Sequence, residues 1–307
     1  MSDILKAIGN TPIVKLKNIV PGGCGEIYVK IEAFNPTGSK KDRMALSMIL
    51  GAEKRGILKK GMTVVEYSGG STGAGLAFVC SLKGYNFRLV TADVFGKEKI
   101  DLMRSLGANL EIIKSSDGKI NKELITKMIK KADQISKEPN TFFTNQLNNT
   151  DVIEGFVPLG EEILNQLDGN VDAVCDTVGT AGTLMGIAKA LKKAKSSCKV
   201  IAVEPSSSPI LSKGIKGSHN VEGVGLGFVP NIYDDTLVDN VITIDEAVAR
   251  KTCKDLAKKE GIFCGTSSGM NVAAAIQISK ELGAKSKVVT VACDTGLKYL
   301  SEGLFDD

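Results

Sequence analysis

The sequence predicts an α/β protein in which twisted, parallel-type sheets carry helices on both faces. Short runs rich in β-branched and aromatic residues alternate with longer runs of helical periodicity along nearly the whole chain. A helix between two strands returns the chain across one face of the sheet, so repeated strand–turn–helix units give parallel strands. With 307 residues, 43% of them hydrophobic, the chain is long enough for one large domain or for two lobes.

Four strand–helix units occupy the first half of the chain. The helix at 42–56 ends at a glycine, which is a common helix stop. The strands are expected at 26–32, 62–67, 87–92 and 109–113, and the helices at 42–56, 71–84, 97–107 and along the lysine-rich segment after 113.

The same alternation continues through the second half. A further segment at 151–167 opens it, and strands are expected at 171–177, 199–205 and 286–293, with helices at 183–194, 245–261 and 267–283. A sheet of this type binds its ligand at the carboxyl ends of the strands. The turns that follow the strands are therefore the places where we expect a site.

Composition and charge exclude several classes of protein. The 39 Lys and Arg against 35 Asp and Glu give a net charge of +4, spread along the chain, and aromatic residues make up only 5%. A nucleic-acid partner is not expected, because no basic stripe carries aromatic rings that would stack on bases. The first residues contain no secretory signal, and no apolar run approaches the ~20 residues of a membrane span. We therefore expect a soluble, cytoplasmic protein that does not bind membranes.

A metal centre is not expected either. The single histidine, His219, excludes multi-histidine sites and lies in a polar, turn-like stretch typical of a solvated loop. The seven cysteines form no C-x-x-C pair, and several lie in apolar runs, where free cysteine behaves as a small hydrophobic residue. We interpret them as reduced thiols rather than zinc ligands.

Four turns rich in glycine and hydroxyl groups are the candidate site. None contains the Gly-Lys-Ser/Thr of a Walker loop, and none gives G-x-G-x-x-G between a strand and a helix. The turns are Asn-Pro-Thr-Gly-Ser-Lys-Lys-Asp-Arg at 35–43, Ser-Gly-Gly-Ser-Thr-Gly at 68–73, Gly-Thr-Ala-Gly-Thr at 179–183 and Gly-Thr-Ser-Ser-Gly at 265–269.

Two of these turns indicate a chemistry of their own. In the third, small residues let backbone N–H groups converge before a helix, which makes a phosphate cradle, although a tight turn without a ligand explains it as well. The first places Lys40 and Lys41 at a helix start, where a cation opposes the helix dipole. A lysine joined to a carbonyl group as a Schiff base avoids that cost. Two surface lysines are the simpler interpretation of this turn taken alone.

The ordered set of motifs resembles the cysteine synthase (O-acetylserine sulfhydrylase) and cystathionine β-synthase family. These are pyridoxal phosphate (PLP) enzymes of fold type II, with a two-lobed, tryptophan synthase β-like fold. The resemblance covers nearly the whole chain. Its motifs are Ile-Gly-Asn-Thr-Pro at 8–12, the turns at 35–43 and 68–73, Leu-Gly-Ala-Asn-Leu at 106–110, the turn at 179–183, Val-Glu-Gly-Val-Gly-Leu-Gly-Phe-Val-Pro at 221–230, and Ser-Ser-Gly at 267–269.

The resemblance implies a role for each turn. Lys41 is the catalytic lysine that forms the Schiff base with PLP, and Lys40 takes a position usually filled by an apolar residue. The cofactor phosphate loop corresponds to Gly179, Thr180, Ala181, Gly182 and Thr183, and the hydroxyl that faces the pyridine nitrogen corresponds to Ser267. The groups that hold the substrate carboxylate, and in part the cofactor's 3′-oxygen, correspond to Ser68, Gly69, Gly70, Ser71, Thr72 and Gln146, and Gly223 belongs to a glycine-rich wall near the substrate.

The implied reaction is PLP-dependent β-replacement. A neutral hydroxyl at the pyridine nitrogen makes the ring a weaker electron sink than a carboxylate would, which disfavours racemisation and transamination. Loss of the α-proton together with the β-leaving group is favoured instead, and Lys41 is placed to remove that proton. The resulting α-aminoacrylate accepts a nucleophile at Cβ.

Departures from the family pattern leave the substrates open. The family usually has Thr-Ser-Gly-Asn-Thr-Gly where this chain has residues 68–73, and the smaller side chains at Gly69 and Ser71 are expected to enlarge the space beside Cβ. Glu222 resembles the cystathionine synthase branch. We hypothesise β-elimination from L-cysteine or O-acetyl-L-serine, followed by addition of sulfide, cysteine or homocysteine, with H2S, lanthionine or cystathionine among the products. The alternatives are a standard O-acetylserine sulfhydrylase, a serine/threonine dehydratase and a catalytically silent amino-acid-binding regulator.

The resemblance also implies a division of the chain. Residues 1–41 and 149–307 are expected to form a large PLP-binding lobe, and 42–148 a smaller mobile lobe that closes over the substrate. A homodimer is expected as well.

Overall fold

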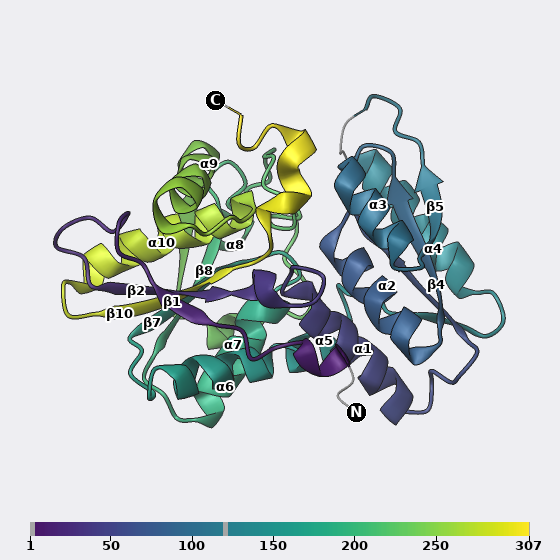
Figure 1. The fold of residues 1–307 in the computed structure, drawn as a ribbon, viewed down its shortest axis with the longest axis horizontal. Helices are drawn as coiled ribbons and strands as arrows, with labels where there is room; N and C mark the ends of the chain where they lie inside the picture. Colours follow the sequence, from purple (N-terminus) through teal and green to yellow (C-terminus); the bar gives the residue numbers. More distant parts are fainter. Residues whose placement is uncertain (1–3, 119–121, 307) are drawn as a thin grey trace.

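The strands of the protein form two separate sheets. The computed structural model describes residues 4–118 and 122–306. Within these residues, the larger sheet has six strands in the order β1–β2–β10–β7–β8–β9 and the smaller has four in the order β5–β4–β3–β6 (Figure 1). All neighbouring strands are parallel except β1 and β2. The strands are β1 (Ile13–Lys15), β2 (Glu26–Ile31), β3 (Thr63–Tyr67), β4 (Asn86–Ala92), β5 (Asn109–Ile113), β6 (Thr141–Phe143), β7 (Ala173–Thr177), β8 (Lys199–Pro205), β9 (Asn240–Ile244) and β10 (Lys287–Ala292).

Helices connect most of these strands. The α-helices are α1 (Lys41–Lys54), α2 (Ser71–Lys83), α3 (Lys97–Ser105), α4 (Lys122–Ser136), α5 (Asp151–Glu154), α6 (Val157–Gln166), α7 (Gly182–Lys193), α8 (Ile210–Lys213), α9 (Glu246–Asp255) and α10 (Thr266–Leu282). Shorter helical turns are η1 (Ile4–Ala7), η2 (Glu32–Phe34), η3 (Asp235–Leu237), η4 (Leu256–Glu260) and η5 (Gly296–Glu302). None of the helices in the described residues is both long and apolar enough to cross a membrane.

Both faces of the six-stranded sheet are covered by helices, because successive strand residues point to opposite faces. Val174 of β7 lies in a core with Leu159 of α6 and Leu184 of α7. Its neighbour Cys175 lies in a second core with Met270 of α10. The predicted α/β class, with parallel-type sheets and helices on both faces, is confirmed.

The four-stranded sheet is built in the same way. Val64 of β3 shares the first core with Leu76 of α2, whereas Val65 lies in a third core with Met128 of α4. The first core therefore continues from one sheet to the other, and α1 lies between them (Figure 1). The molecule has two lobes joined by a common apolar cluster.

The differences from the sequence prediction concern short elements. The structure adds β1, β6 and β9, none of which was predicted. The segment at 151–167 forms two helices, α5 and α6. Pro158 lies in the first turn of α6, where its missing N–H group costs no helical hydrogen bond.

Candidate active site

Two of the predicted turns, at 35–43 and 179–183, lie at one edge of the six-stranded sheet. The neighbouring strands β2, β10 and β7 are parallel, so their carboxyl ends lie side by side. Lys41 begins α1 after β2 and η2, Asp294 follows β10, and the turn at 179–183 follows β7. This is the position at which α/β sheets bind ligands.

Several contacts fix the loop that carries Lys41. The carboxylate of Asp42 accepts a hydrogen bond from the backbone N–H of Thr37 at 2.7 Å. The buried guanidinium of Arg43 forms ion pairs with Glu32 and Glu162, each at 2.7 Å. These contacts hold the start of α1, while the Lys41 side chain itself is only partly buried.

The amine of Lys41 is unusually easy to deprotonate. Burial lowers its pKa to about 8, and the positive charge of the adjacent Lys40 acts in the same direction. Near neutral pH, a far larger fraction of Lys41 than of an ordinary lysine therefore has the neutral amine that a nucleophile or a base requires.

Hydrogen bonds give the second turn a closed shape. The hydroxyl of Ser68 accepts from the backbone N–H groups of Gly70 and Gly73, both at 3.1 Å. Thr72 Oγ1 donates to Gln146 Oε1 at 2.8 Å, and the Gln146 amide donates to the Tyr67 carbonyl at 3.0 Å. The structure thus brings Ser68, Thr72 and Gln146 together at the carboxyl ends of β3 and β6.

Ser71 connects this turn to the six-stranded sheet. Its hydroxyl donates to Asp294 Oδ2 at 3.3 Å and accepts from Lys298 Nζ at 3.1 Å. Tyr299 also donates to Asp294 Oδ2, at 2.7 Å. Asp294 Oδ1 is buried without a hydrogen-bond partner among the described residues.

The third turn is a compact backbone cradle at the start of α7. Ala181 adopts φ of +70°, the left-handed conformation. A side chain at Gly179 would meet the Gly223 carbonyl oxygen at 1.9 Å, so these two glycines are packed backbone to backbone. Thr177 Oγ1, just before the turn, is buried and has no partner within residues 4–118 and 122–306.

The fourth turn lies beside Cys293. Ser267 is in the first turn of α10 and is 8% exposed. The neighbouring Ser268 accepts a hydrogen bond from the Cys293 N–H at 2.8 Å. Burial raises the pKa of the Cys293 thiol to about 11, which keeps it neutral, while the Ser267 hydroxyl acts in the opposite direction.

The expectation that a smaller residue leaves extra space in the substrate turn is wrong for Gly69. A side chain at Gly69 would meet the Phe95 ring at 2.3 Å, so the ring already fills the space that the smaller residue was expected to leave.

Sequence reasoning missed several charged residues around the site. Lys99 of α3 forms ion pairs with Glu222 and Glu302, both at 2.6 Å, and so joins the small lobe to the large one. Asp294 could have been found, because it directly follows a predicted parallel strand. Lys99 does not follow a predicted strand, and no pattern in the sequence indicated a contact with Glu222 or Glu302.

The residues of this site fit PLP, a phosphate-bearing aldehyde. A neutral amine is available at Lys41, and the cradle before α7 presents backbone N–H groups at a helix N-terminus. Two buried polar atoms, Thr177 Oγ1 and Asp294 Oδ1, lack partners where a ligand would supply them.

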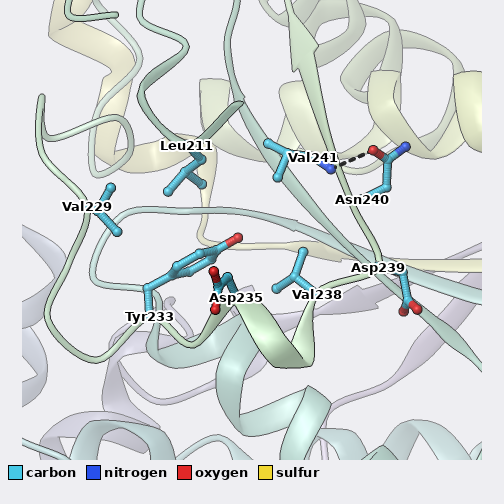
Figure 2. A pocket seen from close by; sticks show the side chains of 8 residues that line it. All are labelled: Leu211, Val229, Tyr233, Asp235, Val238, Asp239, Asn240 and Val241. Atoms are coloured by element: carbon cyan, nitrogen blue, oxygen red, sulfur yellow. Dashed lines mark hydrogen bonds between the residues drawn. The ribbon is translucent and has the colours of Figure 1, made fainter. Parts of the chain in front are cut away.

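A cavity within the described residues lies away from this site. It has a volume of about 490 Å³ and lies beside β9 (Figure 2). None of the residues predicted for the site lines it. Its walls are Leu211, Val229, Tyr233, Asp235, Val238, Asp239, Asn240 and Val241.

Comparison with known proteins gives a consistent result. Residues 4–294 match the family model for pyridoxal-phosphate-dependent enzymes. The cysteine synthase of Staphylococcus aureus is 41% identical, over 100% of this chain and 98% of its own.

Solved structures agree with this assignment. A hydrogen sulfide-producing enzyme from Fusobacterium nucleatum is 37% identical with a TM-score of 0.91, covering 98% of both chains. An O-ureido-L-serine synthase is also 37% identical with a TM-score of 0.91, covering 100% of this chain and 95% of its own. The chain therefore belongs to the cysteine synthase family of pyridoxal-phosphate-dependent enzymes.

Proposed function

We propose that the enzyme catalyses β-replacement on L-cysteine or O-acetyl-L-serine in sulfur amino acid metabolism. The leaving group departs from Cβ as sulfide or acetate, and sulfide or a thiol takes its place. The observation that carries the proposal is the partly buried amine of Lys41, whose pKa of about 8 leaves it available beside the turns at 68–73 and 179–183. The similarity to a hydrogen sulfide-producing enzyme supports cysteine as a first substrate.

Each turn has a distinct task in this proposal. Lys41 holds the cofactor covalently, and its freed amine moves the proton at the substrate Cα. The bound cofactor withdraws electrons from Cα, which makes that proton acidic. Backbone N–H groups at 179–183 hold the phosphate, and Ser267 presents a neutral hydroxyl to the ring nitrogen.

The second turn is proposed to bind the substrate carboxylate. Ser68, Gly69, Gly70, Ser71 and Thr72 surround the start of α2, where backbone N–H groups and the helix dipole favour an anion. Gln146 is held against Thr72 at 2.8 Å and supplies a further amide, and Gly223 lines the opposite wall. The Ser71 hydroxyl is proposed to reach both cofactor and substrate.

A standard cysteine synthase is the second candidate. The 41% identity to the Staphylococcus aureus enzyme favours O-acetyl-L-serine as donor and sulfide as acceptor. In this candidate cysteine is only the product, whereas the first proposal also allows cysteine as the donor that is consumed.

Product analysis separates these reactions. The holoenzyme is incubated with cysteine, O-acetylserine, serine and sulfide in all pairs, and the products are identified by mass spectrometry. Sulfide and a thioether from cysteine alone support the cysteine-consuming reaction. Cysteine formed only from O-acetylserine and sulfide supports the second candidate, whereas pyruvate from serine contradicts both.

We also propose that the two lobes have different roles. Residues 1–41 and 149–307 would form the cofactor-binding lobe, and 42–148 the smaller lobe that moves over bound substrate. The four-stranded sheet, which lies wholly within 42–148, supports this division. We further propose a cytoplasmic location and a homodimer, and sedimentation analysis of the holoenzyme tests the oligomeric state.

A further inference from the structure

A buried ion pair lies directly beside Lys41. The ammonium group of Lys40 contacts both carboxylate oxygens of Asp176, at 2.8 and 3.1 Å. The side chain of Lys40 is 9% exposed and that of Asp176 is fully buried. The two residues come from different elements, because Lys40 precedes α1 and Asp176 lies in β7, next to the phosphate turn.

The position of Asp176 is fixed by the core. Asn271 of α10 donates to Asp176 Oδ1 at 2.7 Å and, through the same amide nitrogen, to the Val291 carbonyl at 2.8 Å. Burial alone would lower the pKa of Lys40, but the negative charge of Asp176 reverses the shift and raises it. Lys40 therefore remains a cation.

Lys41 differs sharply from its neighbour. In the part of the chain that the structure describes, its ammonium nitrogen has no hydrogen bond or ion pair, although its backbone N–H donates to Ser39 Oγ at 3.2 Å. Burial and the charge of Lys40 lower the pKa of Lys41. Three acidic groups act in the opposite direction: Cys293, Asp176 and Asp294.

Of these three groups, Asp176 is the carboxylate that Lys40 contacts with hydrogen bonds, while the charge of Lys40 also lowers the pKa of the Cys293 thiol. Asp294 already accepts hydrogen bonds from Tyr299 and Ser71, and its charge is also near Lys298. Cys293 is a neutral thiol, because burial raises its pKa to about 11. Without Lys40, Asp176 would be a buried carboxylate with no cation, which is a costly state.

We propose that Lys40 is a positioning residue, which holds Asp176 in an ion pair and thereby leaves the Lys41 amine free to bind the cofactor. Attachment of an aldehyde to a lysine forms a carbon–nitrogen double bond and releases water, and it requires the lone pair of a neutral amine. An ion pair between Lys41 and Asp176 would keep a proton on that amine. The inference rests on the proposed function only in taking Lys41 as the cofactor-binding lysine.

The test measures the pKa of Lys41 in the apoprotein. Brief acetylation with acetic anhydride, from about pH 6 to about pH 11, is followed by peptide mass spectrometry, since only the neutral amine reacts. Lys40→Met should raise the pKa of Lys41 by about one unit, so its acetylation at pH 7 falls about tenfold. Lys40→Arg keeps the cation and should behave as the wild type. Lys40→Met/Asp176→Asn removes both charges and should restore a low pKa.

A matched control separates the change in the Lys41 pKa from the general consequences of losing an ion pair with a buried carboxylate. The carboxylate of Asp151 is largely buried and pairs with Arg55, which follows the far end of α1, at 2.6 Å, so Arg55→Met should leave the Lys41 titration unchanged. If Lys40→Met does not fold, Lys40→Gln replaces it, because its amide can still donate to Asp176 without neutralising the charge. A folded Lys40→Met or Lys40→Gln variant with the wild-type Lys41 titration overturns the inference. Attachment of the cofactor to another lysine would contradict the proposed function but leave the measured titration of Lys41 intact.

Discussion

Ala181 has the left-handed backbone that the phosphate turn requires, with φ of +70° at the residue that precedes α7. An alanine in this region costs about 1–2 kcal/mol relative to a right-handed residue, whereas glycine adopts it freely. This chain therefore forms the backbone shape of the turn with a residue that strains it.

Ala181→Gly should therefore be far less destabilising than an ordinary alanine-to-glycine change. We expect a change in unfolding free energy of less than about 1 kcal/mol, because relief of the left-handed alanine offsets the greater freedom of the unfolded chain. Ala188→Gly, in the interior of the same helix, should cost about 1–2 kcal/mol. Urea unfolding of both apoproteins measures the difference, and equal losses would contradict the assigned backbone strain.

Titration of the Lys41 amine should also make the unfolding free energy depend on pH. Its pKa is about 8 in the folded protein and near the ordinary value of 10.5 in the unfolded chain. Between these values the unfolded chain binds more protons, so the stability contributed by Lys41 rises with pH and is lowest below pH 8.

Lys41→Met removes this pH dependence. Relative to Lys41→Met, the wild-type apoprotein should gain stability as the pH rises from about 8 to about 10.5, the window set by the two pKa values. Denaturant unfolding at several pH values gives the comparison. A stability difference that stays constant across the window would show that Lys41 titrates normally.

At the scale of elements, the parallel strands explain which parts of the site the sequence predicts. Lys41 and the turn at 179–183 follow strands that were visible as β-rich runs, and the carboxyl ends of these strands lie at the same edge because β10 pairs in parallel with both. Asp294 follows such a strand too, yet it was missed because the sequence there was interpreted as core. Asp176 is the one charged residue of β7, and its ion pair with Lys40 depends on tertiary packing that periodicity does not reveal.

The contact between the third turn and the Gly223 loop provides a test at this scale. Gly179→Ala places a methyl group against the Gly223 carbonyl oxygen, at a position 1.9 Å away, so one backbone must move. The affinity for PLP should fall by at least about tenfold, because the N–H groups of the cradle lose their alignment. Fluorescence titration of the apoprotein measures it. Gly22→Ala, where no atom lies within 4 Å, is the control, and equal affinities in the two variants would contradict the assignment.

For the whole molecule, the two lobes are joined by a shared apolar core and by Lys99. The side chain of Lys99 is 2% exposed, while Glu222 and Glu302 are 30% and 26% exposed. No sequence pattern pairs a helix of the small lobe with a loop and a C-terminal turn more than a hundred residues away. The division of the chain into two lobes was therefore predicted from the family resemblance alone.

Lys99→Met should loosen the lobes. Two neighbouring carboxylates would remain without their cation, at a cost of about 2 kcal/mol after allowing for their partial exposure. Amide hydrogen exchange in α3 should accelerate, and urea unfolding should shift to lower denaturant. Lys97→Met, at an exposed position on the same helix, is the control and should change neither measurement. Unchanged exchange in the Lys99 variant would remove this residue as a link between the lobes.

The whole account depends on which lysine carries the cofactor, and reduction with sodium borohydride tests this most directly. The reagent converts the bond between lysine and PLP into a stable amine, and peptide mapping then locates the label. The arrangement of the site predicts the label at Lys41, in the peptide that also contains the unlabelled Lys40. A label at Lys40, at any other lysine, or at none would contradict it.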